Sequence, residues 1–379
     1  MQNTGFNKLI KILFKERALG ILLTTSILIF FLQNTLLATP YHLIYMLIVF
    51  LWLFGTILYA EFAIFRHALA VAALIREPWG TLLLTISIVT LEVMLISSVM
   101  LNGTNTNPTL ARDTLYAIIM VMLNGLLGAT LLLGGWRYRE QQINLLGAKS
   151  FLCVIFLIAV FNLILPAYSR GLASGILSPF LTIFLICVSL IVYGIFLGIQ
   201  TVRHRRYFLE VDLDKQRHIH KDNAISYSKR WHLLFLLIYL ILTMSLINII
   251  AVPIDYAMDN LQAPHALGGL LIAMLVLTPE ACVAIRAALC NQLQNAVNVM
   301  LGSVLAAIGL IVPAVLVMGL LTGKTVILGV NYVNETLLWL TFIMSILTIG
   351  SGRTNVLQGA IHLLIFFAYI ALSFYGSTS

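Results

Sequence analysis

The sequence has 379 residues, of which 61% are hydrophobic and only 9% are charged, and its mean hydropathy is +1.02. A water-facing surface needs far more charge, so this composition excludes a chain made of soluble domains. The formal net charge of +8 does not indicate a nucleic-acid partner, because the basic residues lie in short segments between apolar stretches. We therefore expect a protein embedded in a lipid bilayer.

Eleven apolar stretches follow one another along the chain, each long enough to cross a bilayer core of about 30 Å as a helix. We expect an all-α polytopic membrane protein with about eleven transmembrane helices. Residues 64–79 are half-apolar and are expected to form an interfacial or broken extension of the second helix. The expected spans are approximately 19–38, 41–63, 80–101, 114–135, 150–168, 175–200, 232–252, 265–289, 295–321, 334–351 and 355–375.

The first half of the chain divides into an N-terminal tail with helix 1 (1–40) and a block of five expected helices (41–200). The third helix of the chain contains Thr90-Leu91-Glu92, with the glutamate about half-way along it. An acid at the centre of a spanning helix costs roughly 2.5–3.5 kcal/mol, so Glu92 is a candidate functional residue. Another acid, Glu61, is expected near the inner end of the second helix.

The one long polar segment, 201–231, is expected to be a cytoplasmic linker, and residues 232–379 hold five more helices. Because five is odd, the second block enters the membrane from the opposite face, which predicts two inverted-topology repeats, a common plan of secondary transporters. The eighth helix contains Thr278-Pro279-Glu280, which echoes Thr90-Leu91-Glu92 at the same place in its block.

The basic residues predict the orientation. If the N-terminus is cytoplasmic, all of the 22 Lys and Arg residues except Arg112, Arg170 and Lys324 lie in cytoplasmic segments. This distribution follows the positive-inside rule. The N-terminus is therefore expected inside and the C-terminus outside.

Glu92 and Glu280 are the residues expected to bind cations and protons. Two carboxylates that face one cavity repel each other, and burial disfavours their charge, so we expect them to hold protons when no cation is present. A hard cation such as Ca²⁺ prefers oxygen ligands and displaces those protons. The structural alternative, a neutral glutamic acid hydrogen-bonded between helices, is less favoured for two acids in equivalent positions than for one.

Neutral groups near these two acids are candidate supporting residues. Pro279 removes a backbone donor and is expected to disrupt its helix, which frees carbonyl oxygens for a cation. For each hydroxyl, a bond to its own helix is the favoured alternative. Gly302 and the pair Gly125 and Gly128 are expected to allow close helix packing. The other candidate oxygen donors are Thr90, Thr278, Ser87, Asn124, Asn291 and Ser303.

Other polar residues carry weaker signals. His67, His265 and His362 could relay protons, but hydrogen-bonded histidines near the membrane ends are the favoured interpretation. The cysteines have no disulfide or zinc spacing, and no cofactor is expected beyond the transported Ca²⁺, Na⁺ or K⁺ and protons. The sequence also lacks the D-x-x-x-D, H-E-x-x-H and G-x-S-x-G patterns of intramembrane enzymes, so an enzyme is not expected.

Several motifs resemble one family. Over residues 60–375 the chain is similar to the calcium/cation antiporter superfamily, specifically bacterial Ca²⁺/proton antiporters of the ChaA type. The resemblance implies eleven helices in a bacterial inner membrane, with paired glutamates that bind cation and proton in turn, and Ca²⁺, Na⁺ or K⁺ exchanged for protons. The motifs that carry it are Arg66-His67-Ala68, Glu77-Pro78-Trp79-Gly80-Thr81, Leu91-Glu92-Val93, Arg112-Asp113-Thr114, Gly134-Gly135, Pro279-Glu280, Asn291-Gln292, Gly302-Ser303, Val312-Pro313 and Arg353-Thr354-Asn355.

Three departures from the family pattern concern the ion. Relatives often have an Asn three residues before each repeat glutamate, where this chain has Val89 and Leu277, and they tend to have an acid where it has Leu69. The linker is basic and contains histidines, whereas related linkers can be acidic. These departures weaken the case for strict Ca²⁺ selectivity. An Na⁺(K⁺)/H⁺ antiporter of the same fold therefore stays open as an alternative. An uncoupled ion channel also stays open, because the sequence does not show coupling.

Overall fold

The computed structural model describes residues 16–36, 43–75, 79–102, 108–168, 177–208, 229–260 and 265–375. Most of the expected 201–231 linker, and the side chain of His265, lie outside the described residues. Each of the eleven predicted spans coincides with a helix or with a run of consecutive helical segments. In the described part of the chain, ten of these are long and apolar enough to cross a membrane, and a shorter apolar helix covers Arg17–Leu32. The predicted helical membrane architecture is thus confirmed, and the only strands in the described residues are two short ones, of two residues each, that pair with each other.

The first block begins after α2 (Arg17–Leu36), and several of its spans are built from two or three helical pieces. Three of these spans contain π-helical segments: η1 and η2 lie near or beyond the middle of their spans, and η3 lies at the end of its span. The elements are α3 (Leu43–Ala73), α4 (Trp79–Asn102), α5 (Leu110–Met120), η1 (Val121–Leu126), α6 (Leu127–Tyr138), β1 (Gln141–Gln142), α7 (Leu145–Ala159), η2 (Val160–Ile164), α8 (Leu165–Tyr168), α9 (Pro179–Gly198), η3 (Ile199–Arg203) and η4 (Arg205–Phe208).

The second block contains another π-helical segment, η6, near the middle of its third span, as η1 is in the first block. This likeness agrees with the predicted inverted repeat, whose exact limits remain a prediction. The elements are α10 (Lys229–Asn260), α11 (His265–Leu289), α12 (Leu293–Ala306), η6 (Ala307–Ile311), α13 (Val312–Thr322), α14 (Tyr332–Gly350), β2 (Arg353–Thr354) and α15 (Val356–Tyr375).

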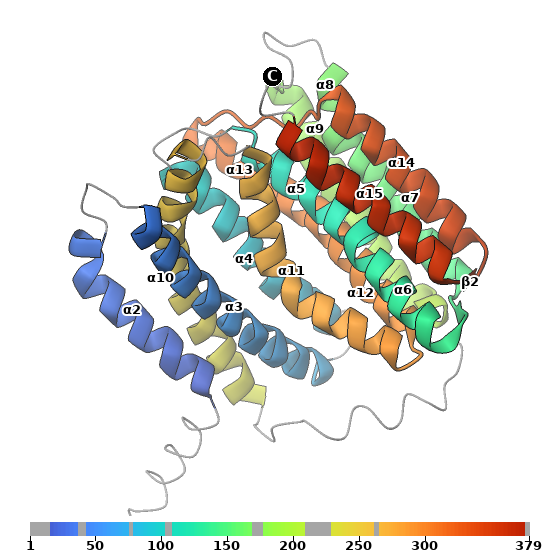
Figure 1. Ribbon diagram of the computed structural model, residues 1–379, viewed down its shortest axis with the longest axis horizontal. Coiled ribbons are helices and arrows are strands. Elements are labelled where there is room, and N and C mark those ends of the chain that lie inside the picture. The colour runs from blue at the N-terminus through green and yellow to red at the C-terminus, as the bar shows by residue number, and fades with distance from the viewer. Residues whose placement is uncertain are drawn as a thin grey trace, which may run out of the picture.

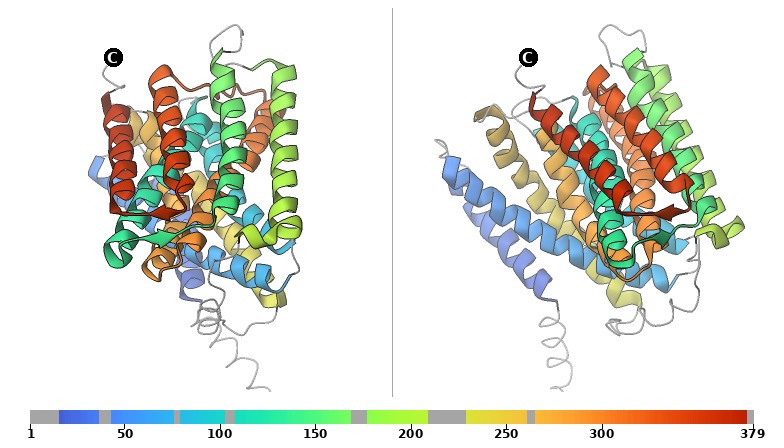
Figure 2. Two further views of the ribbon diagram at one scale, coloured as in Figure 1. Left: turned by 90° about the vertical axis from the view of Figure 1, so that its right-hand side faces the viewer. Right: turned by 45° about the vertical axis from the view of Figure 1, so that its right-hand side comes forward.

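The helices form two groups. α2, α3 and α10 pack against one another and lie together on one side of the molecule (Figures 1 and 2). They contact the larger group mainly through α4 and α11, the two helices that carry the candidate glutamates. In the larger group, α11 also packs against α5 and α6, and α12 against α7. Helices of the two predicted blocks therefore interleave, and α4 and α11 lie between the two groups.

Close packing in the larger group depends on small residues. A Cβ atom added to Gly359 on α15 would lie 2.5 Å from the backbone nitrogen of Leu132 on α6. One added to Gly128 would lie 2.9 Å from the carbonyl oxygen of Gly359. Contacts this short with backbone atoms cannot be relieved by a side-chain rotation, so α6 and α15 require glycine at both positions. This is the packing role predicted for Gly128.

The second helix differs from the prediction in its length. Residues 64–73 form neither an interfacial segment nor a broken one, because α3 continues unbroken to Ala73. Two polar side chains, Arg66 and His67, suggested that the helix ends here. Both contact Glu16, and His67 also contacts His232. Since these partners satisfy the polar groups, the helix remains regular through this segment.

Glu16 is the centre of a buried polar network that ties α2 to α3 and α10. Its Oε2 accepts hydrogen bonds from Arg66 and from the Tyr239 hydroxyl, at 3.1 Å, and lies 3.3 Å from His67 Nε2. His67 Nδ1 lies 2.9 Å from His232 Nδ1, so one ring donates and the other accepts. Burial raises the pKa of Glu16, but the His67 hydrogen bond and the Arg66 charge outweigh it and leave the pKa lowered.

We expect Glu16→Gln to destabilise the protein at neutral pH by about 2 kcal/mol, because it weakens charge-assisted hydrogen bonds to a buried carboxylate. That corresponds to a melting temperature in detergent lower by roughly 2–3 °C. A carboxyl with a lowered pKa stabilises the fold above its ordinary pKa and loses that effect as the pH falls through the folded value. The difference from the wild type should therefore shrink in acid. Glu140→Gln, in an exposed pair with Arg353, is the matched control and should change little; equal melting temperatures for wild type and Glu16→Gln would contradict the role of this network.

Candidate functional site

Glu92 and Glu280 lie on neighbouring helices, α4 and α11, and line one cavity of about 700 Å³. Both are deeply buried, with 4% and 5% of their surface exposed. The Ser303 hydroxyl on α12 donates a hydrogen bond to Glu280 Oε2. The structure thus brings together three of the predicted site residues: both glutamates and Ser303. None of the groups of His, Cys, Asp and Glu in the described part of the chain has three members placed to hold a metal ion, so a cation here would depend on two carboxylates and neutral oxygens.

The cavity reaches the glutamates from one face of the protein. Its lining includes Thr81 and Thr85 near the start of α4, and Arg286 and Cys290 at the end of α11. Asn295, near the start of α12, lines it as well. These three helix ends lie on the same face, the one that the basic residues predict to be cytoplasmic. An ion could therefore approach the two glutamates through this cavity from that face.

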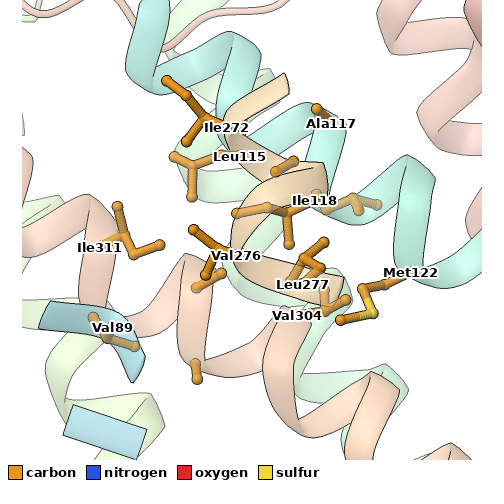
Figure 3. Close-up of a cluster of buried hydrophobic side chains, with 14 of the residues drawn as sticks. Val89, Leu115, Ala117, Ile118, Met122, Ile272, Val276, Leu277, Val304 and Ile311 are labelled. Carbon is orange, nitrogen blue, oxygen red and sulfur yellow. The ribbon is translucent and has the colours of Figure 1, made fainter. Parts of the chain in front are cut away.

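An apolar cluster fills the interior around α11 before Glu280. Figure 3 shows Ile272 and Val276 of α11 among Leu115 and Ile118 of α5 and Ile311 of η6. All five side chains are at most 4% exposed. Ile272 and Val276 precede Glu280 on α11, whereas Arg286 and Cys290 follow it. The two glutamates therefore lie between the cavity on one side and close-packed apolar side chains on the other.

The threonines of the two T-x-E motifs, and Ser87, bond back to their own helices. Thr90 Oγ1 donates to the Ile86 carbonyl oxygen at 2.6 Å, and Thr278 Oγ1 to that of Met274 at 2.5 Å. Ser87 Oγ donates to the Leu83 carbonyl oxygen at 2.7 Å. These three hydroxyls are not among the residues that line the cavity. In this conformation the three hydroxyls therefore bond within their own helices, which was the favoured alternative to a role as cation ligands.

Neither predicted asparagine lies in the cavity lining. Asn124 in η1 is fully buried, where it donates to Thr341 Oγ1 at 2.8 Å and lies 3.2 Å from His362 Nδ1. Asn291 forms the turn between α11 and α12, with a φ of 60°. Its Oδ1 accepts a bond from Gln141 at 3.1 Å. Both therefore stabilise helix contacts and turns in this structure.

The structural roles predicted for Pro279 (a break in its helix) and Gly302 (close helix packing) are not what the structure shows. α11 continues through Pro279, so the helix is not broken there, although the proline leaves the Leu275 carbonyl oxygen without its usual backbone donor. Gly302 does not bring two helices into close contact, because a Cβ there would meet only Phe151, at 4.0 Å. It lines the cavity instead. The small residue thus keeps open the space beside Ser303.

Glu61 is an acid whose position was predicted wrongly. It lies in the interior of α3, is only 3% exposed, and neither carboxyl oxygen has a hydrogen-bond partner. It interacts electrostatically with both Glu92 and Glu280. The expected end of the second helix at residue 63 placed Glu61 near a membrane surface, whereas the longer α3 places it in the middle. The position of Glu61 could have been predicted only if Arg66 and His67 had been recognised as residues with partners inside the bundle.

Comparison with known proteins gives three relevant matches besides the family match. The family described as sodium/calcium exchanger protein matches residues 45–202 and 231–375. The chain is 39% identical over 323 residues to y4hA of Sinorhizobium fredii, whose name describes an ionic transporter, and the match covers 84% of this chain and 86% of that one. It is 37% identical to the sodium-potassium/proton antiporter ChaA of Escherichia coli, with the same shares covered. The solved structure of the Ca²⁺/H⁺ antiporter protein YfkE is similar in fold, with a TM-score of 0.69 at 17% identity over 95% of this chain and 100% of that one.

Proposed function

This chain belongs to the sodium/calcium exchanger protein family, and we propose that it is a secondary active cation/proton antiporter in which Glu92 and Glu280 bind the cation and the protons in turn. One observation carries this proposal: two buried carboxylates, at the equivalent helices of the two predicted blocks, meet at one cavity. Acids in the middle of a membrane protein are costly and commonly mark ion pathways.

Competition for the same oxygens is the proposed basis of exchange. Protons neutralise the two carboxylates when no cation is bound, since two bare charges in a desolvated site repel each other. A cation that enters the cavity replaces those protons as the source of positive charge. Ser303, which already bonds to Glu280, can turn its hydroxyl oxygen toward a cation. Cation and protons are then never bound together, and the site carries one or the other.

Alternating access follows from the two sides of the site. The cavity connects the glutamates to the face where α4 begins and α11 ends, while the apolar cluster around Ile272, Val276 and Ile311 blocks the opposite path. With the N-terminus on the cytoplasmic side of a bacterial inner membrane, this conformation of the protein opens toward the cytoplasm. A movement that closed the cavity and opened the apolar cluster would deliver the cation outside.

We propose Ca²⁺ as the exported cation, because two carboxylates offset its charge and its preferred ligands are oxygens. A second candidate is Na⁺ or K⁺, favoured by the name of the Escherichia coli relative and by Val89 and Leu277 at positions where relatives have Asn. Cation competition separates the two. The uptake of ⁴⁵Ca²⁺ into inside-out vesicles is driven by an imposed pH gradient. Unlabelled Ca²⁺ should inhibit this uptake at far lower concentrations than Na⁺ or K⁺. Uptake of ²²Na⁺ that excess Ca²⁺ does not inhibit would exclude Ca²⁺ as the substrate.

The orientation of the cavity can be tested with a native cysteine. Cys290 lines the cavity at the end of α11 and is exposed. In a variant with serine at Cys153, Cys187 and Cys282, a membrane-impermeant cationic thiol reagent should modify Cys290 in inside-out vesicles and not in intact cells. A transported cation should slow the reaction. Modification from the outside would contradict the proposed orientation, and labelling of a Cys290→Ser variant controls for other targets.

A further inference from the structure

Glu61 is a buried carboxylate that exchange at Glu92 and Glu280 leaves unused. Its helix, α3, packs against α4 and α11, which carry those two residues. Glu61 interacts electrostatically with both of them, although neither of its oxygens has a hydrogen-bond partner. The interior of the bundle therefore holds a third acid within electrostatic range of the cation site.

A structural role does not account for this side chain. A buried acid that only supports the fold accepts or donates hydrogen bonds, as Glu16 does, because an unsatisfied buried polar group is costly. Glu61 gains no such bond in either its ionised or its neutral form. The charge at Glu92 and Glu280 changes during exchange. We therefore look for the role of Glu61 in its electrostatic interaction with that pair.

Glu61 is not placed as a third ligand of the cation. Within the described ranges, no three residues among His, Cys, Asp and Glu could hold one metal ion, so Glu61 lies outside the ligand shell of an ion shared by the pair. The titratable side chains His67 on α3 and His232 on α10 bond to each other, and His67 faces Glu16. The charges that act on Glu61 from α4 and α11 are thus Glu92 and Glu280.

Resting on the proposed function, we propose that Glu61 is a third proton-binding residue of the exchange, which releases its proton when a cation occupies the Glu92 and Glu280 pair. Negative charge on the pair favours a proton on Glu61, since like charges cannot all persist in a desolvated interior. A bound cation adds positive charge within the same range and favours the ionised form. Protonation of Glu61 is then coupled to cation binding without direct contact.

Counting protons tests this coupling. Purified protein in a weakly buffered detergent solution with a pH indicator is titrated with Ca²⁺ and, separately, with Na⁺, and the protons released per bound cation are measured. Glu61→Gln should release up to one proton fewer than wild type. Its cation affinity should also depend less steeply on pH, by up to about tenfold per pH unit. Thr56→Val, on the same helix, is the control and should match wild type.

The outcomes separate the two proposals. Equal proton release and equal pH dependence in wild type and Glu61→Gln overturn the role of Glu61 and leave the antiporter intact. A wild type that binds a cation without releasing any proton overturns the antiporter itself. Should Glu61→Gln fail to fold, infrared difference spectra of Glu61→Asp replace it. The protonated-carboxyl band that this change shifts must disappear when the cation binds, and a shifted band that persists overturns the proposal.

Discussion

Replacing Glu92 or Glu280 by Gln is expected to reduce exchange by at least about 100-fold in each case. Glutamine keeps the size of the side chain but can neither balance a cation nor carry a proton between the two faces. Loss of a desolvated charge partner worth about 3 kcal/mol gives an effect of this size. Both residues line the same cavity and are buried, and a water molecule in the place of either carboxylate would supply no charge to balance the cation. The measurement is cation-driven proton movement in vesicles with matched amounts of inserted protein.

The control for these variants is Glu335→Gln near the start of α14. Glu335 accepts a hydrogen bond from Tyr168 at the surface and lies outside the cavity lining. It should retain exchange near the wild-type rate and show that the amide itself is tolerated. Substantial exchange in either Glu92→Gln or Glu280→Gln would mean that the cation binds elsewhere.

Apparent cation affinity is expected to rise steeply between pH 6 and pH 8.5. In the proposed mechanism, protons and cation compete for the same carboxylates, so each proton displaced adds up to about tenfold in affinity per pH unit. The sign follows directly: acid fills the carboxylates with protons and weakens cation binding, while alkaline pH empties them. Initial rates of ⁴⁵Ca²⁺ or ²²Na⁺ uptake at several cation concentrations and pH values give this dependence.

Ser303→Ala provides a matched comparison for the pH profile. It removes the hydroxyl that bonds to Glu280 but leaves both carboxylates. Its affinity should fall at every pH, while the steepness of the profile should stay close to that of wild type. A flat profile in the wild-type protein would contradict a binding site shared by cation and protons.

The regular parts of this fold could be predicted from the sequence because membrane spans have a strong local signal. Each must be apolar over the thickness of a bilayer, and each expected span coincides with helical structure. The end of α3 could not be found in this way. Arg66 and His67 look like the end of a span, and only their distant partners Glu16 and His232 show why the helix continues. The same error placed Glu61 near the membrane surface.

The candidate site was predictable in its acids and less so in its neutral groups. Glu92 and Glu280 stand out because acids are rare in apolar spans, and their helices do meet at one cavity. Neutral oxygen donors carry no comparable signal, since a hydroxyl in a helix can always bond to its own backbone. Ser303 reaches Glu280, whereas Thr90 and Asn124 bond elsewhere. Which face of each helix meets the cavity depends on packing between distant segments.

The most direct test of cation/proton antiport uses purified protein reconstituted into liposomes that contain a pH-sensitive dye, with equal K⁺ concentrations inside and outside. An outward gradient of Ca²⁺ or Na⁺ should acidify the lumen as protons enter in exchange, and an ionophore that clamps the membrane potential should not abolish the signal. Glu280→Gln liposomes should show no acidification. Cation efflux that leaves the luminal pH unchanged would identify an uncoupled channel and contradict exchange at the two glutamates.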